Sequence, residues 1–217
     1  CIHAPAGGRL PAKLKTQVYR SVEKNKFIWI WMGDADLCHE RDIPTLPQMD
    51  DDKWCYLPRH LTYAANYKLL MDNLLDASHL AFVHAGTLGG GTYHAEILPT
   101  VETFEWGVRV TRKYASIPIP PFVRNVARFT GLADRWQVFS WRIAGNQLVI
   151  ESGQAPAGSG ALEGHFVDEA FHFNSVQTMT PESDTSTHYF FMFANSFADG
   201  KQEVAAETDC QFATILE

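Results

Sequence analysis

The second half of the chain carries the pattern that most restricts its fold. From residue 102 to residue 193, aromatic and β-branched residues alternate with turn residues, as is typical of antiparallel strands joined by short connections. The expected strands cover residues 102–111, 136–141, 147–153, 166–179 and 188–193. We therefore predict an antiparallel sheet as the main element of this half.

The first third of the chain also indicates β structure. Residues 16–22 have the alternation of a strand, a polar turn follows at residues 23–26, and residues 27–31 are rich in aromatic and β-branched side chains. This succession predicts a β-hairpin. Two prolines and the acidic run at residues 50–52 then indicate a solvated connection. We expect a domain boundary near residues 45–60.

Composition excludes several classes of protein. The 217 residues are 46% hydrophobic and 20% charged, which excludes a disordered chain and suits one large domain or about two ordinary ones. A formal net charge of −7 disfavours nucleic acid or an anionic membrane as a partner. No apolar run approaches the roughly 18 residues that a membrane-spanning helix requires, so we expect a cytoplasmic protein. Because the chain begins at Cys1 without a Met and ends at Glu217 inside an expected helix, we expect a piece of a longer polypeptide.

The strongest helical signal lies between residues 69 and 80. Apolar residues recur there at intervals of three and four positions, as one buried helix face requires. They are Leu69, Leu70, Leu74, Ala77 and Leu80. Three polar residues, Asn73, Asp76 and His79, recur at intervals of three and would project from a second side of the same helix.

A second imidazole follows at His84. In a continuous helix, at about 100° per residue, the rings of His79 and His84 would point roughly 140° apart, so they can bind one ion only if the helix unwinds. The glycines that follow His84 give the backbone that freedom. The two rings would then supply two ligands of a 2-His-1-carboxylate iron site. Taken alone, two histidines near a helix end are more often surface or hydrogen-bonded core residues.

Two further metal-ligand patterns are weaker. Cys1 and His3 have the C-x-H spacing of half a Rieske cluster site, but the sequence lacks the C-x-x-H half. His165, Asp168 and His172 form a rival set. Because residues seven apart on a strand face opposite sides, these three cannot converge without a bulge.

The segment from Asn66 to His84 resembles the signature of the Rieske non-haem iron oxygenases, N-x-x-D-x-x-H-x(4)-H. Within that family it is most similar to the vanillate O-demethylase group of aromatic monooxygenases. Supporting likeness lies at residues 28–34, 134–136, 155–158 and 180–182. The resemblance implies an α+β fold, in which residues 1–57 are the C-terminal remnant of a β-rich Rieske [2Fe-2S] domain. Residues 58–217 would form a helix-grip (START-like) catalytic domain, with a curved antiparallel sheet around an apolar cavity.

Site roles follow from the same resemblance. His79 and His84 would bind a mononuclear Fe(II). Asp76 would bridge an iron-ligating His to a cluster-ligating His of a neighbouring subunit, which implies a homotrimer, and Asn73 would act in orientation or hydrogen bonding. The carboxylate ligand is expected beyond Glu217, because the neighbours of Asp209 do not fit the family pattern, and the cluster ligands are expected upstream of Cys1.

The implied function is that of a terminal oxygenase component. Electrons from NADH would reach the Rieske cluster through a reductase or ferredoxin and then pass to the iron, where O₂ is activated to hydroxylate or O-demethylate a small, vanillate-like aromatic acid. The isolated fragment is expected to be inactive. The alternative is a non-catalytic helix-grip domain that binds an apolar ligand without iron.

Overall fold

The computed structural model describes residues 16–51, 54–89, 91–124 and 128–195. Its internal contacts divide the chain into two compact units, Cys1–Leu46 and Pro47–Glu217. The predictions made for Cys1 and His3, and those for Asp209 and the late helix up to Glu217, lie outside the described residues.

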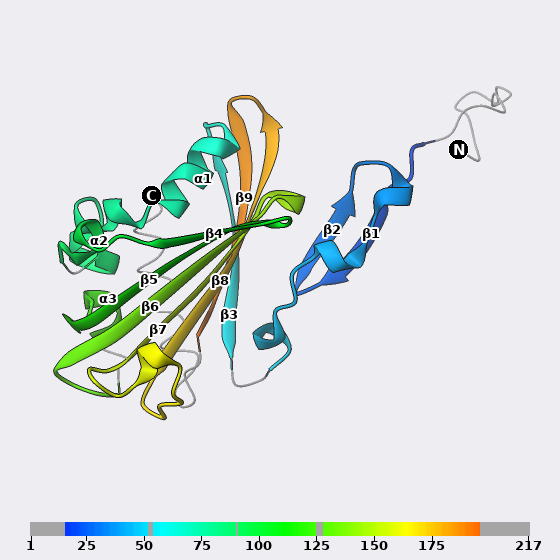
Figure 1. Cartoon of the computed structure of the whole chain (residues 1–217). Helices are drawn as coiled ribbons and strands as arrows, with labels where there is room; N and C mark the ends of the chain where they lie inside the picture. The colour runs from blue at the N-terminus through cyan, green and yellow to red at the C-terminus, as the bar shows by residue number, and fades with distance from the viewer. Residues whose placement is uncertain (1–15, 52–53, 90, 125–127, 196–217) are drawn as a thin grey trace, which may run out of the picture. The chain divides into compact units, whose positions relative to one another are not determined.

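The first unit contains the predicted hairpin, which is confirmed (Figure 1). Strand β1 (Arg20–Lys24) pairs antiparallel with β2 (Phe27–Trp31). The turn is shorter than expected, because only Asn25 and Lys26 lie between the strands, with φ of 55° and 62°. Left-handed conformation at both turn residues is typical of the tight hairpin turns that match strand twist. Two 3-10 turns follow, η2 (Ala35–Leu37) and η3 (Glu40–Asp42).

The second unit is built on one sheet of antiparallel strands, in the order β3-β9-β8-β7-β6-β5-β4 (Figure 1). The strands are β3 (Cys55–Tyr63), β4 (Thr100–Phe104), β5 (Gly107–Pro118), β6 (Leu132–Arg142), β7 (Gln147–Pro156), β8 (Phe171–Ser183) and β9 (Ser186–Asn195). The predicted antiparallel sheet is therefore present, and β3 joins its edge from a segment that the sequence assigned to a connection.

Two strand predictions were wrong in their limits. The single strand expected over residues 102–111 is a hairpin of β4 and β5, turned at Glu105 and Trp106. β5 begins at Gly107, and this position requires glycine because a Cβ there would lie 1.9 Å from the carbonyl oxygen of Trp141 on β6. The strand expected from residue 166 begins only at residue 171, because a turn, closed by Ala170 N–H donating to Val167 O at 3.0 Å, precedes it.

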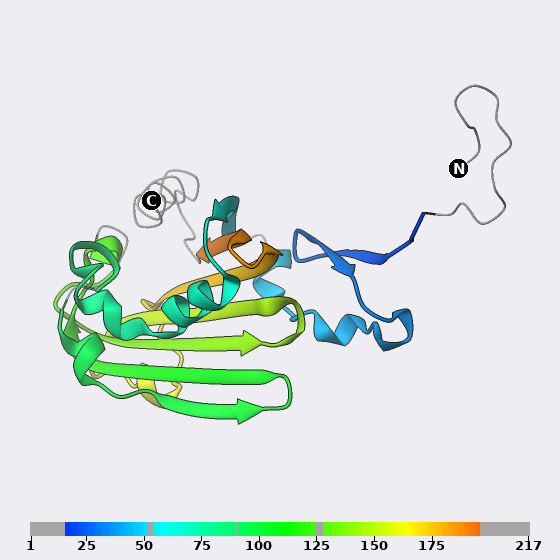
Figure 2. The ribbon, with the colours of Figure 1, turned by 90° about the horizontal axis from the view of Figure 1, so that it is seen from above.

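Helical segments of the second unit lie over one face of the sheet (Figures 1 and 2). They include α1 (Tyr67–Leu75), the 3-10 helix η5 (Ala77–Ala81), the π-helical turn η6 (Ala85–Gly89), α2 (Tyr93–Glu96) and α3 (Pro121–Arg124). Shorter 3-10 turns are η4 (Pro47–Asp50), η7 (Ala144–Asn146) and η8 (Ala161–Glu163). Within the described ranges, no helix is long and apolar enough to span a membrane.

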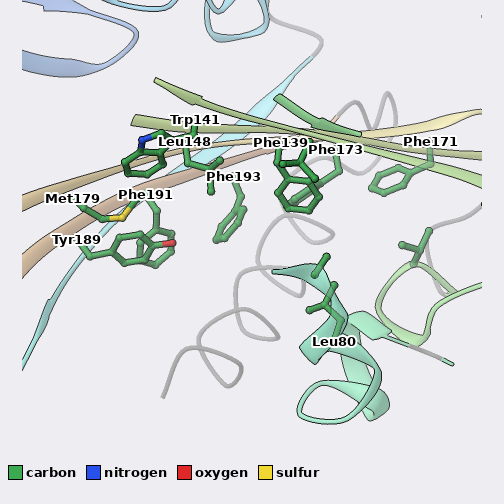
Figure 3. Close-up of a cluster of buried hydrophobic side chains, with 13 residues drawn as sticks. Leu80, Phe139, Trp141, Leu148, Phe171, Phe173, Met179, Tyr189, Phe191 and Phe193 are labelled. Atoms are coloured by element: carbon green, nitrogen blue, oxygen red, sulfur yellow. The ribbon is translucent and has the colours of Figure 1, made fainter. Parts of the chain in front are cut away.

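The hydrophobic core lies between this face and the helices (Figure 3). Phe139, Phe173 and Phe193 project from three different strands towards Leu80 of η5. Leu70 and Leu74 of α1 pack against the same cluster. Leu69 was predicted on that face but is 62% exposed. The sheet with helices on one face confirms the α+β class.

Candidate functional site

Asp76 ends the helix that the sequence predicted to continue. α1 stops at Leu75, and the backbone of Asp76 (φ −89°, ψ 84°) leaves the helical conformation. The Asp76 carboxylate then caps η5 by accepting the Ser78 N–H at 2.9 Å. Hydrogen bonding to Ser78 holds the pKa of the Asp76 carboxyl below its usual value. The expectation that Asn73, Asp76 and His79 share one side of a continuous helix was therefore wrong.

His79 and His84 converge even so. Their ring centroids are 5.3 Å apart, with an interplanar angle of 71°. Nδ1 of His79 is hydrogen-bonded to the carbonyl oxygen of Asp76. Since a carbonyl only accepts, this bond selects the tautomer with the proton on Nδ1 and the lone pair on Nε2, which is the arrangement of a metal-binding imidazole. The chain unwinds as the spacing required, but it begins to do so at Asp76, before His79.

The segment after His84 is tightly turned. The carbonyl of His84 accepts hydrogen bonds from Thr87 N at 3.0 Å and from Gly89 N at 2.9 Å. Burial lowers the pKa of the His84 imidazole, and the nearby His79 lowers it further. A neutral imidazole is the form that binds a metal ion. The surroundings of His84 therefore favour the neutral imidazole, the form that can bind a metal.

Both imidazoles open into a cavity of about 310 Å³ between the helices and the sheet. Its other polar lining comes from Asn73 on α1 and from five positions on β6, β7 and β8. Those strand residues are Arg135, Gln137, Ser152, Ser175 and Gln177. Most of the remaining lining is apolar or aromatic: Tyr63, Leu70, Leu74, Ala77, Leu80, Leu88, Phe139, Ile150, Phe173, Tyr189 and Phe193. This is the composition of a site for a small, largely apolar ligand.

A buried polar network extends from the cavity wall into the protein, and it was not predicted from the sequence. Arg135 Nη1 donates to His94 Nε2 at 3.2 Å, His94 Nδ1 meets the Tyr114 hydroxyl at 2.9 Å, and that hydroxyl donates to Gln137 Oε1 at 3.3 Å. His94 is fully buried. Burial, reinforced by the charge of Arg135, lowers the pKa of His94 to about 3. Its imidazole is therefore neutral, with its proton on Nδ1.

A second hydrogen-bonded chain crosses the cavity floor. The Tyr189 hydroxyl donates to Gln177 Oε1 at 2.6 Å, and Gln177 Nε2 donates to Ser175 Oγ at 2.9 Å. All three side chains are buried and line the cavity. The only sequence signal for them is that they lie in predicted strands. Alternation along a strand predicts which face of the sheet each side chain is on, but not which side chain it bonds.

Across the residues that the structure describes, no three His, Cys, Asp or Glu side chains are close enough to hold a metal ion. His172, from the rival set with His165 and Asp168, instead packs edge-on against the Trp136 ring at 5.5 Å. The described part of the site thus offers a pair of imidazoles. Imidazole is a suitable ligand for iron, and a third ligand and open positions complete such sites.

Comparison with known proteins decides the family. Residues 63–216 match the model of the vanillate O-demethylase oxygenase C-terminal domain. The chain belongs to this family. The match runs from the last residue of β3 and includes both histidines and every residue that lines the cavity. The site therefore lies within the matched domain.

Curated relatives of this vanillate O-demethylase family chain are oxygenase subunits. It is 38% identical over 200 residues to the iron-sulfur subunit of the toluene-4-sulfonate monooxygenase system of Comamonas testosteroni, covering 91% of this chain and 57% of that protein. It is 33% identical over 195 residues to the vanillate O-demethylase oxygenase subunit of a Pseudomonas strain, covering 88% and 58%. The chain therefore spans less than two thirds of the relatives it matches.

Solved structures agree with these relatives. Dicamba monooxygenase bound to 3,6-dichlorosalicylic acid superposes with a TM-score of 0.85 at 25% identity, covering all of this chain and 62% of that one. A second structure of dicamba monooxygenase, which contains non-haem iron and dicamba, matches with a TM-score of 0.72 at 25% identity, covering 95% and 57%. Relatives of the chain are thus iron-sulfur oxygenase subunits, and one is a protein with non-haem iron.

Proposed function

We propose that this chain is the catalytic part of the terminal oxygenase component of a Rieske-type aromatic monooxygenase. The observation that carries the proposal is the convergence of His79 and His84 on the wall of a cavity lined by apolar and aromatic side chains. Two histidines alone do not identify an iron site, because they are often surface or core residues. Here the family and its oxygenase relatives support the assignment.

His79 and His84 are proposed to bind a mononuclear Fe(II), with a carboxylate beyond Glu217 as the third ligand. When bound, such an iron centre supplies reductive activation of O₂. The protein holds the imidazole of His79 by the bond from Nδ1 to the Asp76 carbonyl, which would leave Nε2 to bind the metal. Apolar side chains such as Leu80 and Phe139 line the same cavity and limit the access of water.

Asp76 and Asn73 are proposed to assist this centre. The Asp76 side chain is exposed, as contact with a neighbouring subunit requires, and its lowered pKa keeps it a carboxylate that can accept a hydrogen bond from an imidazole. It would bridge His79 or His84 to a cluster-ligating His across the subunit boundary of a homotrimer. Asn73 lines the cavity beside both histidines, where its amide can orient a ligand or a bound molecule by hydrogen bonding.

Electrons are proposed to come from NADH through a separate reductase or ferredoxin and a Rieske [2Fe-2S] cluster held upstream of Cys1. Residues 1–57 would then be the remnant of that cluster domain and residues 58–217 the catalytic domain, in a cytoplasmic protein. Support comes from the relatives, whose names describe an iron-sulfur subunit and oxygenase components or subunits of larger systems.

The proposed substrate is a small aromatic acid that is hydroxylated or O-demethylated. A volume of about 310 Å³ is at the small end of ligand pockets in proteins, which fits a single substituted ring. Relatives are named for toluene-4-sulfonate, vanillate and dicamba. A panel of methoxybenzoates assayed for formaldehyde release with the complete enzyme system tests the reaction, and an absence of formaldehyde across the panel would contradict O-demethylation.

Metal analysis of the full-length protein tests the iron site. We expect one mononuclear Fe(II) per chain after anaerobic reconstitution, and loss of that iron in His79→Ala and in His84→Ala. His165→Ala is the matched control, because this exposed histidine does not line the cavity. Iron content unchanged by both cavity substitutions, or absent from the parent protein, would favour an apolar-ligand domain without iron.

The proposed role of Asp76 needs a separate test. Asp76→Asn keeps a side-chain oxygen that can cap η5 at the Ser78 N–H but removes the negative charge. We expect this variant to retain iron and to lose electron transfer from the cluster, measured by single-turnover oxidation of the reduced cluster with substrate present. A normal single-turnover rate would refute the bridging role.

A further inference from the structure

The backbone just after His79 touches the turn that follows His84, and the contact lies at Gly89. A Cβ built on Gly89 would lie 2.1 Å from the carbonyl oxygen of Leu80, the residue after His79, and 3.1 Å from the carbonyl oxygen of His84. Atoms cannot approach so closely, so any side chain at this position would force η5 and η6 apart. Glycine is therefore the residue that lets the backbone beside His79 pack directly against the backbone beyond His84.

Side chains from outside these two segments hold the same backbone in place. The Tyr93 hydroxyl donates to the Gly89 carbonyl at 2.5 Å. Arg135 Nη1, from β6, donates to the Leu88 carbonyl at 3.3 Å. These bonds fasten η6 to both α2, which carries Tyr93, and β6, which carries Arg135.

His94 holds the Arg135 guanidinium in this position. Its neutral ring accepts from Arg135 at Nε2, and its other nitrogen is bonded to the Tyr114 hydroxyl. The backbone of α2 is fixed in turn, because Arg112 Nη1 donates to the carbonyls of His94 at 2.9 Å and Ile97 at 2.8 Å. The support behind η6 is therefore a buried, hydrogen-bonded part of the sheet.

We propose that Gly89, Tyr93 and Arg135 are positioning residues that set the separation of His79 and His84 and so the affinity of the site for its metal. This group is named here the Gly89 clasp, and none of its members is proposed as a ligand of the metal. The inference rests on the proposed iron site. It adds that backbone packing and hydrogen bonds of the fold hold the two rings with centroids 5.3 Å apart, which lowers the cost of ordering the ligands when a metal binds.

Substitution of Gly89 tests the clasp. In the full-length protein, we expect Gly89→Ala to weaken the binding of Fe²⁺, and of Co²⁺ as a spectroscopic substitute, by about 10-fold to 100-fold, the range found when residues behind metal ligands are changed. The matched control is Gly86→Ala in the same turn, where a Cβ meets no atom within 4 Å. We expect its metal affinity to stay within about twofold of the parent.

A second variant and a second readout separate positioning from general damage to the fold. Tyr93→Phe removes only the hydroxyl that bonds Gly89, and we expect a loss of metal affinity in the same direction. The d–d absorption of bound Co²⁺ should change in Gly89→Ala, because one imidazole is displaced. The clash with the Leu80 carbonyl should lower the metal-free unfolding temperature by several degrees relative to Gly86→Ala, while unfolding stays cooperative.

Two different results would overturn the inference. If the parent binds Fe²⁺ through His79 and His84, and Gly89→Ala and Tyr93→Phe bind it within about twofold with an unchanged Co²⁺ spectrum, the clasp is refuted and the iron site stands. If the parent binds no Fe²⁺, the proposed function fails and the clasp fails with it.

Discussion

Acid should destabilise this protein through the buried imidazole of His94. The ring is fully buried, and burial together with the charge of Arg135 lowers its pKa to about 3 from an ordinary value of 6.5. The unfolded chain therefore binds a proton at this residue at a pH where the folded chain does not. Because the unfolded state binds more protons, the free energy of unfolding falls as the pH falls.

The size of the effect follows from the two pKa values. The stability contributed by His94 is intact above about pH 7 and is lost between about pH 6.5 and pH 3. At pH 5 the loss is about 2 kcal/mol, and below pH 3 it approaches about 5 kcal/mol. A loss of about 2 kcal/mol is a large share of the stability of an ordinary domain.

Urea unfolding followed by tryptophan fluorescence at pH 7 and pH 5 measures this loss. His94→Gln removes the titrating group and keeps an amide that can accept from Arg135 and donate to Tyr114. We expect the variant to be less stable than the parent at pH 7 but to lose about 2 kcal/mol less on going to pH 5. The exposed His165→Gln should follow the parent. Equal losses in the parent and His94→Gln would refute the reasoning.

Three further substitutions test the core and two local contacts of the sheet, each by urea unfolding followed by circular dichroism. Phe139→Ala removes a buried ring of the core and should lower the free energy of unfolding by about 3–5 kcal/mol. Phe166→Ala, at a residue 91% exposed, should change it by no more than about 0.5 kcal/mol. Similar values for both would contradict the packing of the core. Gly153→Ala places a Cβ 1.9 Å from the Trp136 ring and should cost about 1–3 kcal/mol, so a neutral result would be inconsistent with that contact. Asp134→Ala removes a buried carboxylate that accepts two backbone N–H groups at 2.9 and 3.0 Å and should cost about 1–3 kcal/mol or more, which an unchanged midpoint would refute.

Strand alternation was the most informative signal in the sequence because most strands of the large sheet have one face on the core. In β9, Tyr189, Phe191 and Phe193 all join the hydrophobic cluster, as a period of two requires. The same alternation cannot locate a tight turn between two strands. It continues through Glu105 and Trp106, so β4 and β5 were taken for one strand, although the backbone reverses there.

The buried polar groups could not be found from the sequence, for a different reason. His94, Tyr114, Arg135 and Gln137 come from a short helix and two strands, and each satisfies the others' hydrogen bonds only after the sheet has formed. Alternation does place Arg135 and Gln137 on the same face of a strand. Nothing in the local sequence indicates that a neutral histidine lies between them.

The helix break at Asp76 explains why the signature residues have their spacing. Periodicity alone favoured a helix through Leu80, because Asp is only a mildly poor helix former inside a helix. Asp is, however, a favoured N-cap, and here it caps η5 with its carboxylate while its carbonyl bonds Nδ1 of His79. The residue that ends one helix thus begins the next and orients the first imidazole. The interval from Asp76 to His79 is therefore the length of the turn that Asp76 caps. The backbone contact at Gly89 brings the segment after His84 against Leu80, next to His79. The spacing of the signature thus reflects two local structures rather than one helix face.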